Sequence, residues 1–135
     1  MSDLFLFDTS VLVDYLRTGR HQHRIETVTG LVRSSSVVLA ELWRGATTPA
    51  EREFLRVLSK NHPILTPTEN NWLESGQILG SIRAAKGFPS DRLRDLHFDV
   101  LIALTARSHG ACLITSNRGD FEMISQTRNF RFEVW

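Results

Sequence analysis

The sequence lacks most of the features that mark secreted, membrane-spanning or disulfide-stabilised proteins. Its single cysteine, Cys112, excludes a disulfide within the chain. No apolar run approaches the roughly 20 residues that span a bilayer. The start, Met1-Ser2-Asp3, has no basic segment of the kind that opens a signal peptide. Repeats, low-complexity stretches and linkers are also missing, so we expect one domain over residues 1–135, located in the cytoplasm and away from membranes.

Lysine is scarce as well, and arginine takes its place. Only 2 of the 16 basic side chains are lysine and 14 are arginine, although the net charge is just +1. The planar guanidinium of arginine binds phosphate oxygens through two hydrogen bonds at once. A basic surface beside an acidic site would suit a nuclease, because phosphate contacts supply most of the non-specific affinity for nucleic acids. A genome that favours arginine codons explains the same imbalance, and both explanations stay open.

Short apolar segments alternate with helical patterns along the whole chain. Strands are expected at residues 4–7, 31–34, 63–65, 111–115 and 130–134. Helices are expected at residues 9–19, around 25–28, at 35–45, from 49 onwards, between 67 and 87, from 91 to about 108, and around 121–124. Strands separated by helices predict a mainly parallel sheet, with right-handed crossovers that place helices on both faces. The expected fold class is therefore α/β.

Four acidic residues lie next to or within apolar segments, where charge is normally excluded. Asp8 follows the first strand, and Glu41 interrupts an apolar helix. Asp99 precedes five apolar residues, and Asp120 follows the polar turn after the fourth strand. Sites in parallel sheets form beyond the carboxyl ends of the strands, and all four acids can reach that edge. Like charges gathered there repel each other unless a divalent cation joins them, which points to a metal-dependent phosphodiester enzyme.

Three of the acids also have a purely structural explanation. Asp8 would cap the helix that follows it. Glu41 would pair with Arg44, one helical turn later, on an exposed face. Asp120 would cap the helix that follows the polar turn. Capping does not exclude metal binding by Asp8, because its two carboxylate oxygens can serve different partners.

Polar residues near the acids are interpreted as supporting groups. Asp95 lies four residues before Asp99 on the same helical face. We assign the ligand role to Asp99 and stabilisation of the helix start to Asp95. Ser10 and Thr115, each near a strand end, are expected to orient water or a ligand. Asn117 is expected to supply a neutral oxygen or to hydrogen-bond a carboxylate.

Four sequence blocks carry these residues in a fixed order. They are Phe7-Asp8-Thr9-Ser10, Val38-Leu39-Ala40-Glu41-Leu42, Phe98-Asp99-Val100-Leu101-Ile102-Ala103, and Leu113-Ile114-Thr115-Ser116-Asn117 with Asp120-Phe121. Together they resemble the PIN-domain family, most closely its VapC-type toxin ribonucleases. The resemblance implies a three-layer α/β/α sandwich, a site for Mg²⁺ or Mn²⁺, cleavage of single-stranded RNA, a homodimer, and a cognate antitoxin whose tail enters the groove.

The resemblance also assigns the acids by position. Asp8, Glu41 and Asp99 match the three main catalytic and metal-binding acids of the family, and Asp120 matches the fourth. Many relatives place an acid where this chain has Asn117. That departure puts a second metal site in question and leaves the first unaffected.

The expected function is therefore that of a metal-dependent endoribonuclease, the toxin of a toxin–antitoxin pair, which cleaves single-stranded or loop regions of RNA. Arg44 and Arg118 are expected to contact phosphate. The alternative is a non-catalytic PIN-like module that binds RNA or a protein. A phosphoryl-accepting receiver domain or a DxD phosphatase fits less well. Both would need a second acid close after Asp8, and Ser10 stands there instead.

Overall fold

The centre of the fold is a parallel sheet. In the computed structural model, which describes residues 3–135, the strands lie in the order β3-β2-β1-β4-β5 and every pairing is parallel. The strands are β1 Leu4–Phe7, β2 Leu31–Ser35, β3 Ile64–Leu65, β4 Ala111–Thr115 and β5 Phe132–Val134. Met1 and Ser2, part of the segment used above to argue against a signal peptide, lie outside the described residues. Because β1 pairs with both β2 and β4, its carboxyl end lies in the middle of the sheet edge.

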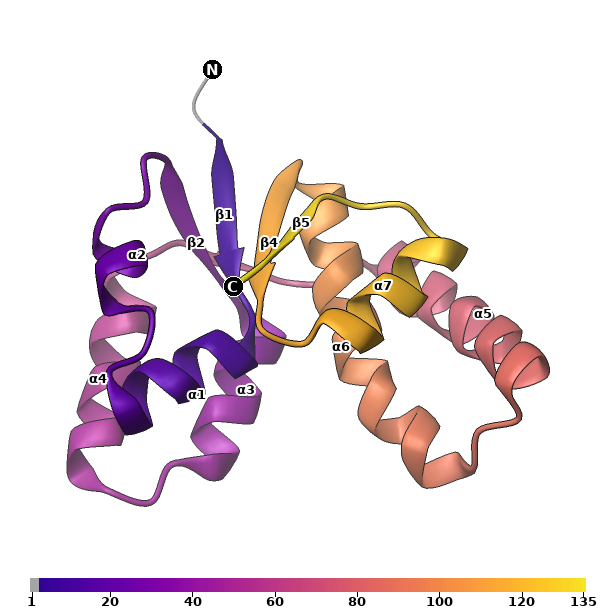
Figure 1. Cartoon of the computed structure of the whole chain (residues 1–135), viewed down its shortest axis with the longest axis horizontal. Helices are drawn as coiled ribbons and strands as arrows, with labels where there is room; N and C mark the ends of the chain where they lie inside the picture. The colour runs from indigo at the N-terminus through magenta and orange to yellow at the C-terminus, as the bar shows by residue number, and fades with distance from the viewer. Residues whose placement is uncertain (1–2) are drawn as a thin grey trace.

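Helices cover both faces of this sheet. They are α1 Thr9–Thr18, α2 Gln22–Glu26, α3 Ser36–Gly45, α4 Pro49–Asn61, α5 Glu69–Lys86, α6 Ser90–Ser108 and α7 Arg118–Thr127. Figure 1 shows α1–α4 gathered on one side of the sheet and α5–α7 on the other. Right-handed crossovers produce this division, because the chain moves outward from β1 to β3 and then returns past β1 to β4. The predicted three-layer α/β/α fold is confirmed.

Local sequence signals explain the helices that carry the acids. Ser35 caps α3, because its side-chain oxygen accepts a hydrogen bond from the backbone N–H of Val38 at 3.3 Å. Helix α6 is apolar and buried on every side from Val100 to Ala106, and it packs against α5 and β4. Burial of a helix around its whole circumference anchors it in the core. Asp99 therefore lies at the point where α6 enters the core.

Some element boundaries differ from the predicted ones. Helix α2 lies earlier than the predicted 25–28, because His21 turns the chain in the left-handed region (φ 68°) directly before it. Helix α7 begins at Arg118, three residues before the predicted start, because Asn117 caps it. Strand β5 is shorter than predicted and pairs only with residues 113–115 of β4. Between residues 3 and 135, no helix combines the length and apolar character needed to cross a membrane.

Candidate active site

Asp8 lies at the carboxyl end of the central strand. Its backbone N–H donates to the carbonyl oxygen of Ile114 at 2.8 Å, which fixes it between β1 and β4. The side chain is 3% exposed, and its Oδ2 accepts hydrogen bonds from Ser10 Oγ at 2.7 Å and Thr115 Oγ1 at 2.8 Å. It occupies the N-cap position of α1 but makes no side-chain cap bond. Because that cap bond is missing, capping does not account for this carboxylate. Burial raises the pKa of Asp8, although its hydrogen bonds oppose that rise.

Glu41 reaches the same edge from α3. Its Oε1 accepts a hydrogen bond from Thr9 Oγ1 at 2.8 Å, so consecutive residues of the first motif hold two of the acids. Partial burial raises the pKa of Glu41, the Thr9 bond lowers it, and the charge of Asp8 raises it further. The described residues form no ion pair between Glu41 and Arg44. The exposed pairing proposed as a structural explanation for Glu41 is therefore wrong.

The carboxyl group of Asp99 has a strongly raised pKa. Burial raises its pKa to about 8, and the charges of the other three acids add to the shift. Its side chain is also hydrogen-bonded to that of Asp120, an arrangement that keeps the proton on Asp99. Charges that act on one another in this way belong to one site. Asp8, Glu41, Asp99 and Asp120, which the sequence predicted to converge, are thus brought together, and we call them the acid cluster.

Asp120 differs from the other three because a cation neutralises it. Its carboxylate binds the guanidinium of Arg92 and accepts a hydrogen bond from Asn117 Nδ2 at 3.1 Å. Partial burial raises the pKa of Asp120, but Arg92 and Asn117 outweigh it and the net shift is downward. Asn117 Oδ1 accepts from the Asp120 backbone N–H at 3.4 Å, so Asn117 is the cap of α7. The explanation of Asp120 as the helix cap is wrong.

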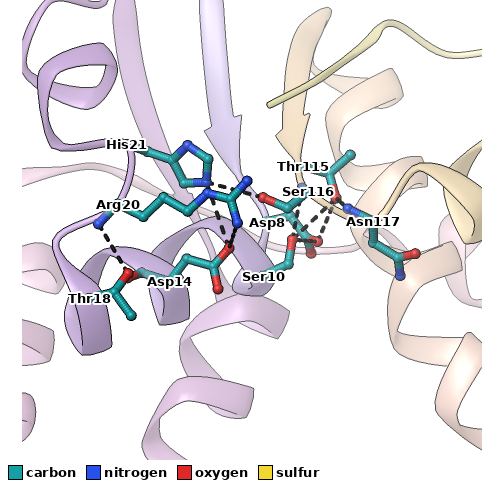
Figure 2. Close-up of polar contacts among 9 residues, drawn as sticks. All are labelled: Asp8, Ser10, Asp14, Thr18, Arg20, His21, Thr115, Ser116 and Asn117. Carbon is teal, nitrogen blue, oxygen red and sulfur yellow. Dashed lines mark hydrogen bonds and ion pairs between the residues drawn. The ribbon is translucent and has the colours of Figure 1, made fainter.

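A chain of short polar side chains fixes the geometry around Asp8. Ser116 N–H donates to Ser10 Oγ at 3.0 Å, and Asn117 N–H donates to Thr115 Oγ1 at 2.9 Å. Figure 2 shows these residues from the start of α1 and the end of β4 pointing toward one another around Asp8. Ser10 and Thr115 were predicted to orient water or a ligand; in the structure both hydroxyls donate to the Asp8 carboxylate, and the predicted role stays a prediction.

Two of the predicted site residues form no hydrogen bond or ion pair with the acid cluster among the described residues. Asp95 is exposed and lies well inside α6, which begins at Ser90, so it cannot stabilise the start of that helix. Asp91 is the acid in the first turn of α6. Arg118 pairs with Glu122 at 3.0 Å on the exposed face of α7. Arg44 lies nearer the cluster, because its charge lowers the pKa of Glu41 and its guanidinium covers a neighbouring aromatic ring.

Sequence reasoning missed two residues that contact the acids, Thr9 and Arg92. A hydroxyl next to Asp8 is a weak signal, because Thr9 reaches an acid that is 32 residues away in sequence. Arg92 precedes Asp99 by seven residues, which is two helical turns and therefore the same face of α6. That spacing was the available clue to Arg92.

The acid cluster suits a divalent cation in its donor chemistry. Mg²⁺ and Mn²⁺ prefer carboxylate oxygens, and a dication would relieve the repulsion that raises the pKa of Asp99. Within residues 3–135, no three Asp, Glu, His or Cys side chains are arranged so that they could hold an ion together. Mg²⁺ usually binds through one or two carboxylates and keeps several waters. The residues therefore fit a partly hydrated ion better than a closed protein cage.

The fold and the acid cluster define a parallel α/β domain with convergent carboxylates at the carboxyl edge of its central strands. The chain belongs to the PIN domain family, which matches residues 5–125. This assignment confirms the family that the sequence motifs indicated.

Solved structures of similar fold agree with this assignment. The chain resembles one in DNA-bound VapBC from Salmonella typhimurium, with 28% identity, a TM-score of 0.71, and coverage of 100% of this chain and 99% of that one. It resembles VapBC2 from Rickettsia felis, bound to a promoter DNA fragment, with 22% identity, a TM-score of 0.73 and 98% coverage of each chain. For VapBC-1 from nontypeable Haemophilus influenzae the identity is 21%, the TM-score 0.72 and the coverage 98% of each chain. No curated protein matches the sequence.

Proposed function

We propose that the protein is a metal-dependent endoribonuclease that cleaves single-stranded or loop regions of RNA and acts as the toxin of a toxin–antitoxin pair. The observation that carries the proposal is the convergence of the acid cluster, three of whose members have raised pKa values. Membership of the PIN domain family supports the nuclease part, and the similarity to chains from VapBC complexes supports the toxin part.

In this mechanism Asp8, Glu41, Asp99 and Asp120 would hold Mg²⁺ or Mn²⁺, one or two of them directly and the others through water. The bound cation would supply an activated water and neutralise charge on the phosphoryl oxygens. Asp99 would give up the proton that it shares with Asp120 when the cation binds, because ligating carboxylates must be ionised.

The surrounding residues fix the acids and receive the substrate. Ser10 and Thr115 hold Asp8 through one oxygen, Oδ2, and leave Oδ1 free of their hydroxyls. Thr9 holds Glu41. Arg44, close enough to lower the pKa of Glu41, is placed to contact a phosphate of the RNA.

Cleavage of a structured RNA in Mn²⁺, followed by addition of EDTA, tests the proposal. Asp8→Asn should abolish cleavage, because the neutral amide loses the charge that holds the cation. The melting temperature of the metal-free variant should be unchanged or higher, since the buried charge of Asp8 is removed while an acceptor oxygen remains for Ser10 and Thr115. Asp3→Asn, an exposed change before the amino end of β1 and so at the opposite end of the sheet, is the matched control and should cleave normally. Cleavage that persists in EDTA or in Asp8→Asn would refute the metal mechanism.

The second candidate is a non-catalytic PIN-like module that binds RNA or a protein. The pairing of Asp120 with Arg92 favours it, because an acid neutralised by arginine is a poorer metal ligand. RNA binding without any cleavage in Mg²⁺ or Mn²⁺ would support this candidate over the nuclease.

An apolar groove between α1, α2 and α4 is the docking site that we propose for the antitoxin. The hollow has a volume of about 240 Å³. Its lining includes Leu12, Tyr15, Ile25, Phe54 and Val57. Val57 is 46% exposed, although it is a large apolar side chain on a helix that otherwise carries many charges. An apolar segment of a partner would bury this surface, as in helix-in-groove recognition.

We also propose that the protein forms a homodimer. Measurement of its molar mass by light scattering tests this proposal.

A further inference from the structure

Three arginines of the chain share one arrangement: each guanidinium lies over an aromatic ring. The pairs, with the distance from guanidinium carbon to ring centroid, are Arg24 over Trp135 at 5.4 Å, Arg44 over Phe98 at 5.6 Å and Arg92 over Phe88 at 5.2 Å. Arg44 and Arg92 act on acids of the cluster. The pair of Arg24 and Trp135 has no role in the mechanism described above.

Trp135 is attached directly to the machinery that holds Asp8. Its backbone N–H donates to the carbonyl oxygen of Thr115 at 2.8 Å, and Thr115 holds the Asp8 carboxylate through its hydroxyl. The indole ring lies 5.6 Å from the ring of Phe7, the residue before Asp8. Trp135 is thus in contact with the residue that precedes Asp8 and with one that holds its carboxylate.

His21 connects the same indole to the loop after β4. Its imidazole lies 5.7 Å from the Trp135 ring, and its Nε2 lies 3.4 Å from Ser116 Oγ. Figure 2 shows His21 facing Ser116 and Asp14 at the side of the Asp8 network. His21 adopts a left-handed backbone conformation (φ 68°), which is costly for a residue other than glycine. The turn into α2, and hence the position of Arg24, is thus fixed against the site.

Arg24 is available to a ligand. It is exposed, and within residues 3–135 it forms no ion pair with a carboxylate. Together with Trp135 it lines an open hollow of about 410 Å³, whose other walls include Thr27, Thr29 and Val134. Glu133 also lines this hollow, where its carboxylate accepts a hydrogen bond from the Trp135 indole N–H at 3.3 Å. A cation, an aromatic ring, hydroxyl groups and one carboxylate that is bound to the indole thus surround a space within the size range of small-ligand sites.

We infer that Arg24 and Trp135 form a nucleotide subsite for the RNA strand next to the acid cluster; this inference rests on the proposed ribonuclease function. Arg24 contacts a backbone phosphate through its guanidinium, which lies over the Trp135 ring. The base or sugar of the same nucleotide packs in the hollow. Aromatic rings and arginine planes alternating along a basic path are the pattern by which proteins hold single-stranded nucleic acid.

The subsite also answers an electrostatic problem of the acid cluster. A cluster of carboxylates repels RNA, so the strand must be held by cations on either side of it. Arg92 on α6 is already paired with Asp120, whereas Arg44 lies on α3 and Arg24 on α2, which contributes no acid to the cluster. Each phosphate that flanks the cleaved one would then contact an arginine. Such contacts would explain why the chain contains many more arginines than lysines.

The test is the binding of fluorescein-labelled octauridylate, measured by fluorescence anisotropy at several NaCl concentrations in the Asp8→Asn background. Arg24→Ala should weaken binding about tenfold and reduce the slope of log K against log salt by about 0.7, the value for one phosphate contact on a single strand. Arg24→Lys should recover part of the affinity, because it restores the charge and not the planar stacking. Arg83→Ala, an exposed change on α5 outside the cluster, is the matched control and should leave both quantities unchanged.

A second variant ties the effect to the indole. Trp135→Leu should weaken octauridylate binding, and the double variant with Arg24→Ala should lose less than the product of the two single losses, because both residues serve one nucleotide. Circular dichroism verifies that each variant is folded. The inference is overturned if Arg24→Ala binds RNA like Arg83→Ala, as it would if Arg24 served a protein partner, or if the Asp8→Asn parent does not bind the oligonucleotide. Failure of the nuclease proposal shows up separately, as RNA that is bound with this dependence on Arg24 and never cleaved.

Discussion

Asp99 shows how a single residue sets the charge of the acid cluster. Burial and three neighbouring carboxylates raise its pKa to about 8, so the metal-free protein holds a proton there at neutral pH. The same carboxyl would be ionised beside a bound dication, because the cation reverses the sign of the local potential. The protonation of Asp99 therefore reports whether the cluster is occupied.

The stability of the metal-free protein should fall as the pH rises from about 4 to about 8. The pKa of Asp99 increases from 3.8 in the unfolded chain to about 8 in the fold, so the folded state binds more protons throughout that interval. Stability that is present below pH 3.8 is then lost at up to about 1.4 kcal/mol per pH unit. Burial raises the pKa of Asp8 and Glu41 too, which adds to the same trend. Melting temperatures measured in EDTA from pH 4 to 9 test this prediction.

Asp99→Asn is the variant that isolates this effect. It should flatten the pH dependence and raise the melting temperature at pH 8, because the neutral amide has no charge to desolvate. Asp3→Asn, an exposed change before the amino end of β1, should leave the curve as it is in the wild type. Parallel curves for the wild type and Asp99→Asn would show that Asp99 is ionised in the metal-free protein at neutral pH.

At the scale of elements, the contact between α6 and α7 controls how many acids remain available to a cation. Arg92 on α6 binds Asp120 on α7, while Asn117 caps α7 and donates to the same carboxylate. Arg92 is in turn held over the ring of Phe88. Because the arginine and the metal compete for one carboxylate, this contact should weaken metal binding and stabilise the metal-free fold.

Arg92→Gln should therefore have opposite effects on stability and on metal affinity. Loss of the ion pair should destabilise the metal-free protein at pH 7 by about 1 kcal/mol, since both side chains are partly exposed to water. The freed Asp120 carboxylate should increase the affinity for Mn²⁺ severalfold, as measured by titration calorimetry. Arg118→Gln, which breaks an exposed pair with Glu122 on α7, is the control and should change neither quantity by much. A lower Mn²⁺ affinity in Arg92→Gln would show that Arg92 assists the site.

At the scale of the whole molecule, the sequence predicts the layers and the position of three acids because these depend on local patterns. The strands before Asp8 and Asp120 and the apolar run after Asp99 are visible as runs of hydrophobic residues. The partners of the acids depend instead on tertiary contacts: Thr9 and Glu41 are 32 residues apart, and Arg92 and Asp120 are 28 apart. No periodicity encodes such pairs. The start of α2 was missed for a local reason, because His21 adopts a left-handed turn that its residue type does not indicate.

The last prediction concerns the separation of the nuclease edge from the proposed docking groove. Val57 lies on α4, and its exposed side chain lines the groove between α1, α2 and α4, which contains no acid of the cluster. Val57→Asp should abolish association with the proposed antitoxin, because an unpaired carboxylate would be buried in an apolar interface. Cleavage of RNA should persist, since no contact of the acid cluster changes.

Co-purification with the antitoxin and an RNA cleavage assay measure the two effects separately. Arg56→Gln alters the neighbouring exposed residue of α4, which pairs with Glu53 and does not line the groove, so this control should still associate. In cells, Val57→Asp should stay toxic when the antitoxin is co-expressed, whereas the wild type should be neutralised. A variant that still binds the antitoxin would exclude this groove as its docking site. A folded variant that has also lost cleavage would show that the groove and the acid cluster are coupled, because α1 borders both.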